Sequence, residues 1–299
     1  MAASSLTHGR TDGTGTRAVE AGLDALDDAA QLPKGPGLGK RLVRGLLPPL
    51  VFLAALVGVW QLAYEAKIKP SYALPAPAEV GEVFWSAVTD GRAAEAIWTS
   101  LSRGGLGFAL SLVVGTLLGL AMWWSRWLRA AIGPIVSGLQ SLPSVAWVPA
   151  AIIWFGLTDA AIYTVVLLGA VPSIANGLLS GMKQVPPLFD RVGRVLGLSA
   201  LGRTRYVLLP AALPGYLGGL RQGWAFAWRS LMAAEIYVTI LTGFGLGHLL
   251  HYGRELNAME QVIGIMIVIV VIGLVVDRAL FSPWENFLHR RWGTNVRQT

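Results

Sequence analysis

The sequence lacks cysteine altogether and carries little charge. With no cysteine among its 299 residues, disulfides, thiol catalysis and cysteine-ligated metal sites are excluded. Charged residues make up only 14% of the chain, hydrophobic residues make up 54%, and the mean hydropathy is +0.56. Several apolar runs approach the roughly 20 residues that a helix needs to cross a bilayer. This balance excludes a soluble core and predicts an all-α membrane protein.

The sequence has no convincing nucleotide-binding or catalytic motif. The stretch GPGLGKR at residues 35–41 resembles a phosphate loop, but it is one residue short between its glycines and has no Ser or Thr after Lys40. His248 and His251 share one predicted loop, yet without carboxylate or cysteine partners this spacing rarely binds metal. We therefore expect no catalysis, cofactor or metal in this chain. Membrane topology explains the net charge of +7 better than nucleic acid does.

Hydropathy predicts six transmembrane helices. They cover residues 45–64, 98–124, 130–155, 160–181, 212–240 and 262–281. If the amino terminus is inside, the interior loops contain many more Lys and Arg residues than the exterior loops do. The positive-inside rule then places both termini in the cytoplasm.

The chain divides into four predicted segments. Residues 1–40, rich in Gly, Thr and Asp, cannot bury a core and are predicted to be a disordered cytoplasmic tail. Residues 41–95 contain the first span and an amphipathic segment that lies along the outer surface, with a plain connecting loop as the alternative. Residues 96–283 form a core of five spans with a cytoplasmic loop at 183–209. Residues 284–299 form a second cytoplasmic tail.

Small residues recur at every fourth position on three of the predicted spans. This spacing lets membrane helices approach closely, so we expect these three faces to pack together, although ordinary helix packing needs no functional role. The small residues are Gly107, Ser111, Gly115 and Gly119; Gly169, Ser173, Gly177 and Gly181; and Gly215, Gly219 and Gly223.

The third span differs because Pro143 and Pro149 interrupt it. Interrupted membrane helices are tolerated where neighbours or a water-filled path satisfy the freed backbone groups. The interruption, with Ser144 and Trp147, is therefore a candidate wall of a transport pathway. A simple packing kink is the alternative.

Four charged residues fall inside the predicted spans away from their cytoplasmic ends, where each is a functional-site hypothesis. Arg103 and Glu235 lie at similar depth, so we predict that they form a structural ion pair. Arg221 lies near the middle of the fifth span, where it could attract an anion in transit or cap the carbonyls freed near Pro143. Arg229 is assigned to the same pathway.

The cytoplasmic loop between the fourth and fifth spans is basic and punctuated by Gly and Pro. Pro186 and Pro187 end one helix and can begin a short helix over residues 188–196, after which Gly197 offers a left-handed C′ position and Ser199 can cap a second short helix. Apolar side chains among arginines favour insertion into a groove on another protein, with anionic lipid headgroups as the alternative. The candidate docking residues are Asp190, Arg191, Gly193, Arg194, Gly197, Leu198, Ser199, Leu201, Arg203, Tyr206 and Pro210.

These residues carry a resemblance to a known family. RVLGLS at residues 194–199 followed by LPAALP at 209–214 resembles the "EAA" loop of bacterial ABC importer permeases. Further stretches resemble the aliphatic-sulfonate, taurine and nitrate branch: LQSLPSVAWVPAAIIWFGL at 139–157, AEIYV at 234–238, TGFGLGHLLHYGREL at 242–256 and IGLVVDRAL at 272–280. One departure is that Arg191 occupies the acidic position of the loop motif, with Asp190 one residue away.

The resemblance implies a permease of the type I ABC importer fold in a bacterial inner membrane. It implies two cytoplasmic ABC ATPases that hold ATP and Mg²⁺, an extracytoplasmic substrate-binding protein, and a second permease copy, most economically as a homodimer. The implied solute is a small oxyanion such as an aliphatic sulfonate, taurine or nitrate. The alternative function is an ion-gradient-driven secondary transporter or channel. Such proteins often have two similar halves, and the interrupted third span has no convincing second copy here.

Overall fold

The structure, a computed structural model, describes residues 38–238 and 243–292, in which every regular element is helical. The chain divides into two units, residues 1–62 and 63–299, which are described separately. The described part of the first unit belongs to α2 (Leu38–Glu65), a 28-residue helix that contains Pro48 and Pro49. Most of the predicted tail at residues 1–40 lies outside the described residues; its last three residues begin α2.

The second unit contains the remaining helices. In chain order they are α3 (Pro77–Thr89), α4 (Arg92–Trp124), α5 (Arg126–Ser141), α6 (Val148–Phe155), α7 (Asp159–Gln184), α8 (Pro187–Val195), α9 (Ala200–Arg203), α10 (Leu209–Tyr237), α11 (Leu246–Glu255), α12 (Met259–Val276) and α13 (Ser282–Trp292). A 3₁₀ turn (Ser144–Trp147) precedes α6, and π-helical turns join α9 to α10 and α12 to α13.

Four helical stretches in the described residues are long and apolar enough to cross a membrane. They are Leu47–Glu65, Arg92–Trp124, Asp159–Gln184 and Met259–Leu288, and they match the first, second, fourth and sixth predicted spans. A fifth is added if the bent pair of α5 and α6 counts as one span. Helix α10 has 29 residues, enough to cross, but its arginines, glutamine and glutamate make it less apolar.

The third predicted span, residues 130–155, is not one interrupted helix. Helix α5 ends at Ser141, and the following stretch, Ser144–Phe155, turns by 104°. Pro143 has an extended backbone (φ −56°, ψ 127°), and its ring allows no backbone donor to continue the α5 hydrogen bonds. The break predicted at this proline is therefore a sharp change of direction.

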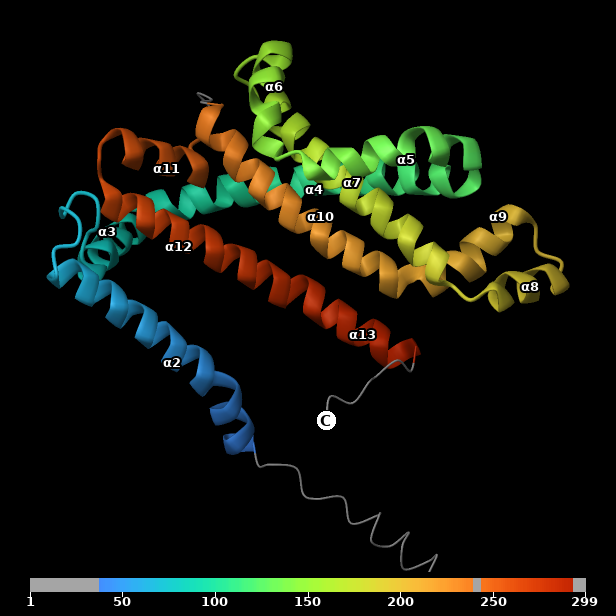
Figure 1. The fold of residues 1–299 in the computed structure, drawn as a ribbon, viewed down its shortest axis with the longest axis horizontal. Helices are drawn as coiled ribbons and strands as arrows, with labels where there is room; N and C mark the ends of the chain where they lie inside the picture. Colours follow the sequence, from blue (N-terminus) through green and yellow to red (C-terminus); the bar gives the residue numbers. More distant parts are fainter. Residues whose placement is uncertain (1–37, 239–242, 293–299) are drawn as a thin grey trace, which may run out of the picture. The chain divides into compact units, whose positions relative to one another are not determined.

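Helices α4, α7 and α10 form the centre of the second unit, and they approach through the predicted small residues (Figure 1). A Cβ added to Gly177 would lie 2.4 Å from the Cα of Gly219, and one added to Gly181 would lie 2.8 Å from the carbonyl oxygen of Ala212. On α4, a Cβ at Gly115 would lie 2.8 Å from the Ile174 side chain. The structure thus confirms the packing of the three small-residue faces.

This close approach gives a testable consequence. Gly219→Ala should separate α7 from α10 and lower the free energy of unfolding by about 1–3 kcal/mol, because the new methyl group would lie 2.5 Å from the Gly177 Cα. The matched control is Gly218→Ala, where nothing lies within 4 Å of the added atom. Thermal unfolding in detergent compares the two variants. Equal midpoints would contradict the packing described here.

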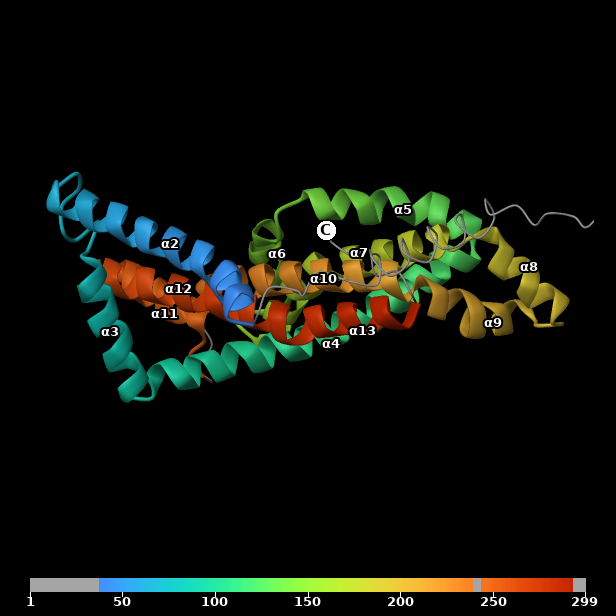
Figure 2. The ribbon, with the colours of Figure 1, turned by 90° about the horizontal axis from the view of Figure 1, so that it is seen from below.

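The helical arm of α8 and α9 projects from one end of the α7–α10 pair, and α3 and α11 lie toward the other end (Figures 1 and 2). The amphipathic segment before the second span is a helix, α3, followed by the first turns of α4. The second short helix of the loop between the fourth and fifth predicted spans is continuous with the fifth span, because a π-helical turn, Thr204–Leu208, joins α9 to α10 without a break.

Candidate functional site

The first half of the arm is ended by a glycine. Helix α8 runs from Pro187 to Val195, and Gly197 then has φ +74°. The Leu198 amide donates to the Gly193 carbonyl and the Gly197 amide to the Arg194 carbonyl, each at 3.0 Å. This pair of hydrogen bonds is a Schellman motif, in which a left-handed residue satisfies the last carbonyls of a helix. The predicted left-handed position of Gly197 is confirmed.

The second half of the arm is capped as the sequence predicts. The Ser199 Oγ accepts a hydrogen bond from the Gly202 amide at 3.2 Å, and the Ser199 carbonyl accepts from the Arg203 amide at 2.8 Å. A serine with extended φ and ψ at this position satisfies donors that a helix start leaves open. Pro210 lies in the first turn of α10, directly after the π-helical turn, and its ring provides no amide proton to continue the helical hydrogen bonds.

Asp190 holds the two halves of the arm together. Its Oδ1 accepts from Arg203 Nε at 2.9 Å, and its Oδ2 accepts from Arg194 Nε at 3.0 Å. Hydrogen bonds from Arg194, supported by Arg203, lower the pKa of Asp190 below its ordinary value, so the carboxylate stays ionised. Gly193 allows the approach, since a Cβ there would lie 3.0 Å from the Arg203 stem.

The arm presents apolar side chains to its surroundings. Val195 is 88% exposed and Leu196 is 70% exposed, alongside exposed Leu188, Leu201 and Tyr206. Exposed arginines lie among them: Arg191, Arg194 and Arg205. Among the predicted docking residues, Leu198 is only partly exposed. The sequence did not single out Leu188, Val195 and Leu196, which are also exposed apolar residues of the arm. Their amphipathic spacing on a short helix is the signal that could have identified them.

A buried ionic cluster joins α4, α7 and α10 toward the end opposite the arm. Arg103 Nη1 lies 3.5 Å from Glu235 Oε1, so the two predicted partners contact each other. Arg103 Nε also donates to Asp159 Oδ1 at 2.9 Å, and Ser100 Oγ donates to Glu235 Oε2 at 2.7 Å. Glu235 is fully buried and Arg103 is 6% exposed. The predicted pair is therefore part of a larger cluster, and Asp159 and Ser100 are additional members.

The same cluster binds the start of α11. Glu235 Oε2 accepts from the Gly247 amide at 3.0 Å, and Ser100 Oγ accepts from the Leu246 amide at 2.8 Å. A carboxylate is favoured at a helix N-terminus because the first amides of a helix have no intrahelical acceptor. A Cβ at Gly245 or Gly247 would lie 2.4 Å from Glu235 atoms. The glycines flanking Leu246 therefore let α11 contact a buried carboxylate directly.

The bend in the third span borders a cavity of about 300 Å³. Three of the predicted pathway residues line it, namely Pro143 and Ser144 at the bend and Arg229 on α10. Trp147 packs against the hydrophobic core, and Pro149 is exposed in the first turn of α6. The structure thus brings half of the predicted pathway residues together.

Arg221 lies apart from this cavity. Its Nε donates to Asp277 Oδ1 at 2.6 Å, and its Nη1 donates to Glu285 Oε2 at 3.3 Å. Both carboxylates belong to the continuous helical stretch of α12 and α13. The Arg221 charge is therefore balanced by protein groups, and its guanidinium does not cap the backbone near Pro143.

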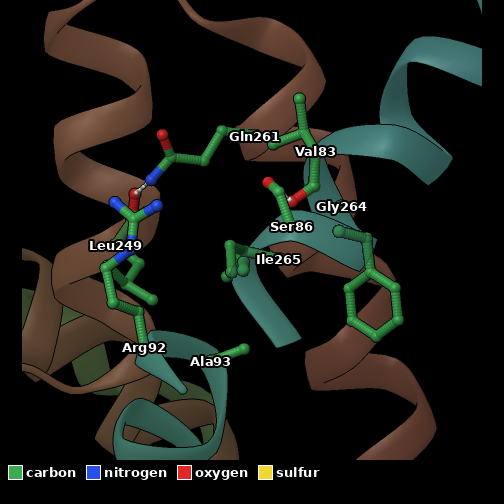
Figure 3. Close-up of a pocket in the computed structure, with 10 residues that line it drawn as sticks. Val83, Ser86, Arg92, Ala93, Leu249, Gln261, Gly264 and Ile265 are labelled. Carbon is green, nitrogen blue, oxygen red and sulfur yellow. Dashed lines mark hydrogen bonds between the residues drawn. The ribbon is translucent and has the colours of Figure 1, made fainter. Parts of the chain in front are cut away.

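Two other cavities lie in the second unit. One of about 70 Å³ lies between α3, α4, α11 and α12, where Gln261 Nε2 donates to the Leu249 carbonyl at 3.3 Å (Figure 3). The other, of about 460 Å³, is mostly apolar and lies between α4, α10 and α13. Within residues 38–238 and 243–292, no cluster of three His, Asp or Glu side chains could hold a metal ion.

Comparisons with known proteins agree with this architecture. Residues 111–281 match the family described as "Binding-protein-dependent transport system inner membrane component". The nitrate import permease protein of Synechocystis is 29% identical over 78% of this chain and 86% of its own length. The taurine transport system permease protein of Escherichia coli is 30% identical over 78% of this chain and 88% of its own length. The inward-facing MetNI methionine ABC transporter superposes with a TM-score of 0.55 at 18% identity, over 65% of this chain and 95% of the matched chain.

Proposed function

From the premise that this chain belongs to the family of binding-protein-dependent transport system inner membrane components, with an all-α type I ABC importer permease fold, we propose that it forms the translocation pathway for a small oxyanion. The named relatives are a nitrate import permease protein and a taurine transport system permease protein. We therefore propose nitrate or an aliphatic sulfonate such as taurine as the solute class. In this proposal a separate extracytoplasmic binding protein delivers the solute to the permease.

The observation that carries the proposal is the arm of α8 and α9. Its exposed apolar side chains lie among arginines on two short helices, and Gly197 and Asp190 fix the angle between those helices. Such a surface suits a hydrophobic groove with an acidic rim on a partner protein. We propose that a cytoplasmic ABC ATPase provides this groove, and that Leu196, Leu201 and Tyr206 enter it.

The direct connection between the arm and α10 suggests how movement is transmitted. Helix α9 continues through the π-helical turn into α10, and α10 packs closely on α7. A displacement of the arm by the ATPase would therefore move α10 as a rigid body and change access to the pathway. Two arms give a symmetric displacement, so we propose a C₂ homodimer in a bacterial inner membrane with both termini in the cytoplasm. ATP and Mg²⁺ would bind the two ATPases.

Purification of the full-length chain from its native membrane tests this proposal. We expect an ABC ATPase to copurify at one copy per permease, because each permease has one arm. A solute-loaded binding protein should then raise the ATPase rate several-fold over the rate with the unloaded binding protein. The reason is that the loaded binding protein favours the permease conformation in which the two ATPases close. A transport-active preparation that contains no ATPase would contradict the proposal.

A further inference from the structure

The cavity at the bend of the third span has polar side chains in its lining. It lies between the α5–α6 bend, α7 and α10, and its lining includes Gln140, Ser144 and Arg229. A volume of about 300 Å³ is at the lower end of the range for small-molecule sites, which suits a small solute.

Arg229 on α10 differs from Arg103 on α4 and from Arg221 on α10. Arg103 pairs with Asp159 and Glu235, and Arg221 pairs with Asp277 and Glu285. Arg229 Nε donates to the Ala225 carbonyl at 3.1 Å, and its guanidinium lies 4.8 Å from the Phe226 ring centroid. In the part of the chain that the structure describes, no carboxylate pairs with Arg229.

An unpaired cation in a membrane-spanning helix is costly unless water or an anion reaches it. Arg229 lines a cavity, so a mobile anion can supply the missing charge. Its two Nη groups form the planar pair of donors that binds carboxylate-like and sulfonate-like oxygens in a bidentate manner.

Two further donors border the same space. The Ser144 hydroxyl makes no hydrogen bond to the described residues. Gln140 Nε2 donates one hydrogen to Ser173 Oγ at 2.9 Å and keeps a second, while its Oε1 accepts from Asn176 at 3.2 Å. The Asn176 contact fixes the orientation of the amide with its nitrogen toward Ser173. The cavity thus combines one cation, one hydroxyl and one oriented amide donor.

We infer that Arg229, assisted by Ser144 and Gln140, is a contact site for the transported oxyanion, an inference that rests on the proposed importer function. The site takes a small anion with several acceptor oxygens, such as nitrate or an alkyl sulfonate. Arg221, which two carboxylates already neutralise, does not provide this contact.

The absence of cysteine allows a direct test. Ser141 lines the same cavity and its hydroxyl donates to the Gly138 carbonyl, so Ser141→Cys introduces a single thiol without removing a proposed contact. The full-length chain in membrane vesicles is treated with a sulfonate-bearing methanethiosulfonate reagent or with its trimethylammonium counterpart. The ratio of the two reaction rates reports the local electrostatic potential.

We expect the anionic reagent to be preferred at Cys-substituted position 141, and Arg229→Gln to lower that preference about tenfold. Arg229→Lys should keep most of the preference because it keeps the charge. Arg221→Gln should leave it unchanged. Thr89→Cys, on the exposed end of α3, is the matched control position, and its rate ratio should not respond to Arg229→Gln.

Protection provides a second measurement that needs no change at Arg229. Millimolar nitrate should slow the reaction of the anionic reagent with the cysteine at position 141, compared with the same concentration of gluconate. The reaction at position 89 should not be slowed. An unchanged rate ratio in Arg229→Gln, or an absence of nitrate protection in the chain with Arg229 intact, would overturn the inference. Occupation of Arg229 by a carboxylate from a second copy would also appear as absent protection. The labelling experiment requires no ATPase, so it tests the anion site separately from the importer proposal. If only the importer proposal is wrong, no ATPase copurifies, but the preference of position 141 for the anionic reagent is retained.

Discussion

Gly197→Val is expected to abolish most ATPase association while leaving the chain in the membrane. A β-branched residue is strained at φ +74°, at a cost of about 1–3 kcal/mol, and the strain is relieved if the Schellman motif opens. Leu198 and Ser199 would then lose their fixed direction relative to α8. We expect an increase of about five- to hundredfold in the dissociation constant for the ATPase.

Gly197→Asn is the matched control, because asparagine adopts the left-handed region more readily than other L residues. Nothing lies within 4 Å of a Cβ added at Gly197, so neither substitution causes a steric clash. Binding of the purified ATPase to permease in nanodiscs compares the two variants. Near-native binding by both variants would show that the left-handed turn is not needed, and equal loss by both would show that its conformation is not the cause.

Glu235→Ala is expected to lower the free energy of unfolding by about 3–5 kcal/mol. The substitution removes one of the carboxylates beside the buried Arg103 guanidinium, and it removes the acceptor of Ser100 and of the Gly247 amide. We therefore expect α11 to detach before the bundle unfolds. Hydrogen exchange of the α11 amides, followed by mass spectrometry, measures the detachment.

A double-mutant cycle separates the ion pair from the rest of this cluster. Arg103→Ala, Glu235→Ala and the double variant should show a coupling of about 0.5–3 kcal/mol, since the side chains contact each other. Glu235→Gln should lower the free energy of unfolding less than Glu235→Ala does, because the glutamine amide oxygen can still accept from Ser100 and Gly247. Additive losses in the cycle would contradict direct contact between Arg103 and Glu235.

The arm of α8 and α9 could be predicted almost residue by residue because its signals are local. Pro187 begins α8, Gly197 ends it, and Ser199 caps the next helix, each through interactions that span only a few residues. The small-residue faces were equally accessible, because a four-residue spacing places them on one side of a helix. These patterns predicted the helices and their contacts without tertiary information.

The partners of the intramembrane charges could not be predicted in full. The contact of Arg103 with Glu235 followed from their similar depth, but Asp159 lies at the first residue of α7, where the sequence shows only the edge of a span. The partners of Arg221 were not predicted, because Asp277 lies near the end of the predicted sixth span and Glu285 lies beyond its expected end at residue 281. The helix continues through a π-helical turn into α13, which brings Glu285 to Arg221.

The direction of the chain after the break in the third span also could not be predicted from the sequence. Pro143 predicts an interruption, but the 104° turn depends on how α6 packs against α7. That packing places Arg229 beside the bend and forms the cavity. The candidate anion site is therefore a product of tertiary contacts.

The central claim is that this chain transports its solute only when an ABC ATPase acts on the α8–α9 arm. Uptake of radiolabelled nitrate or taurine into proteoliposomes tests it most directly, with permease, ATPase and loaded binding protein combined and ATP supplied on the ATPase side. The account predicts uptake that requires ATP, persists when proton and sodium gradients are collapsed, and is lost in Gly197→Val. Uptake by the chain alone, driven by an ion gradient, would contradict it.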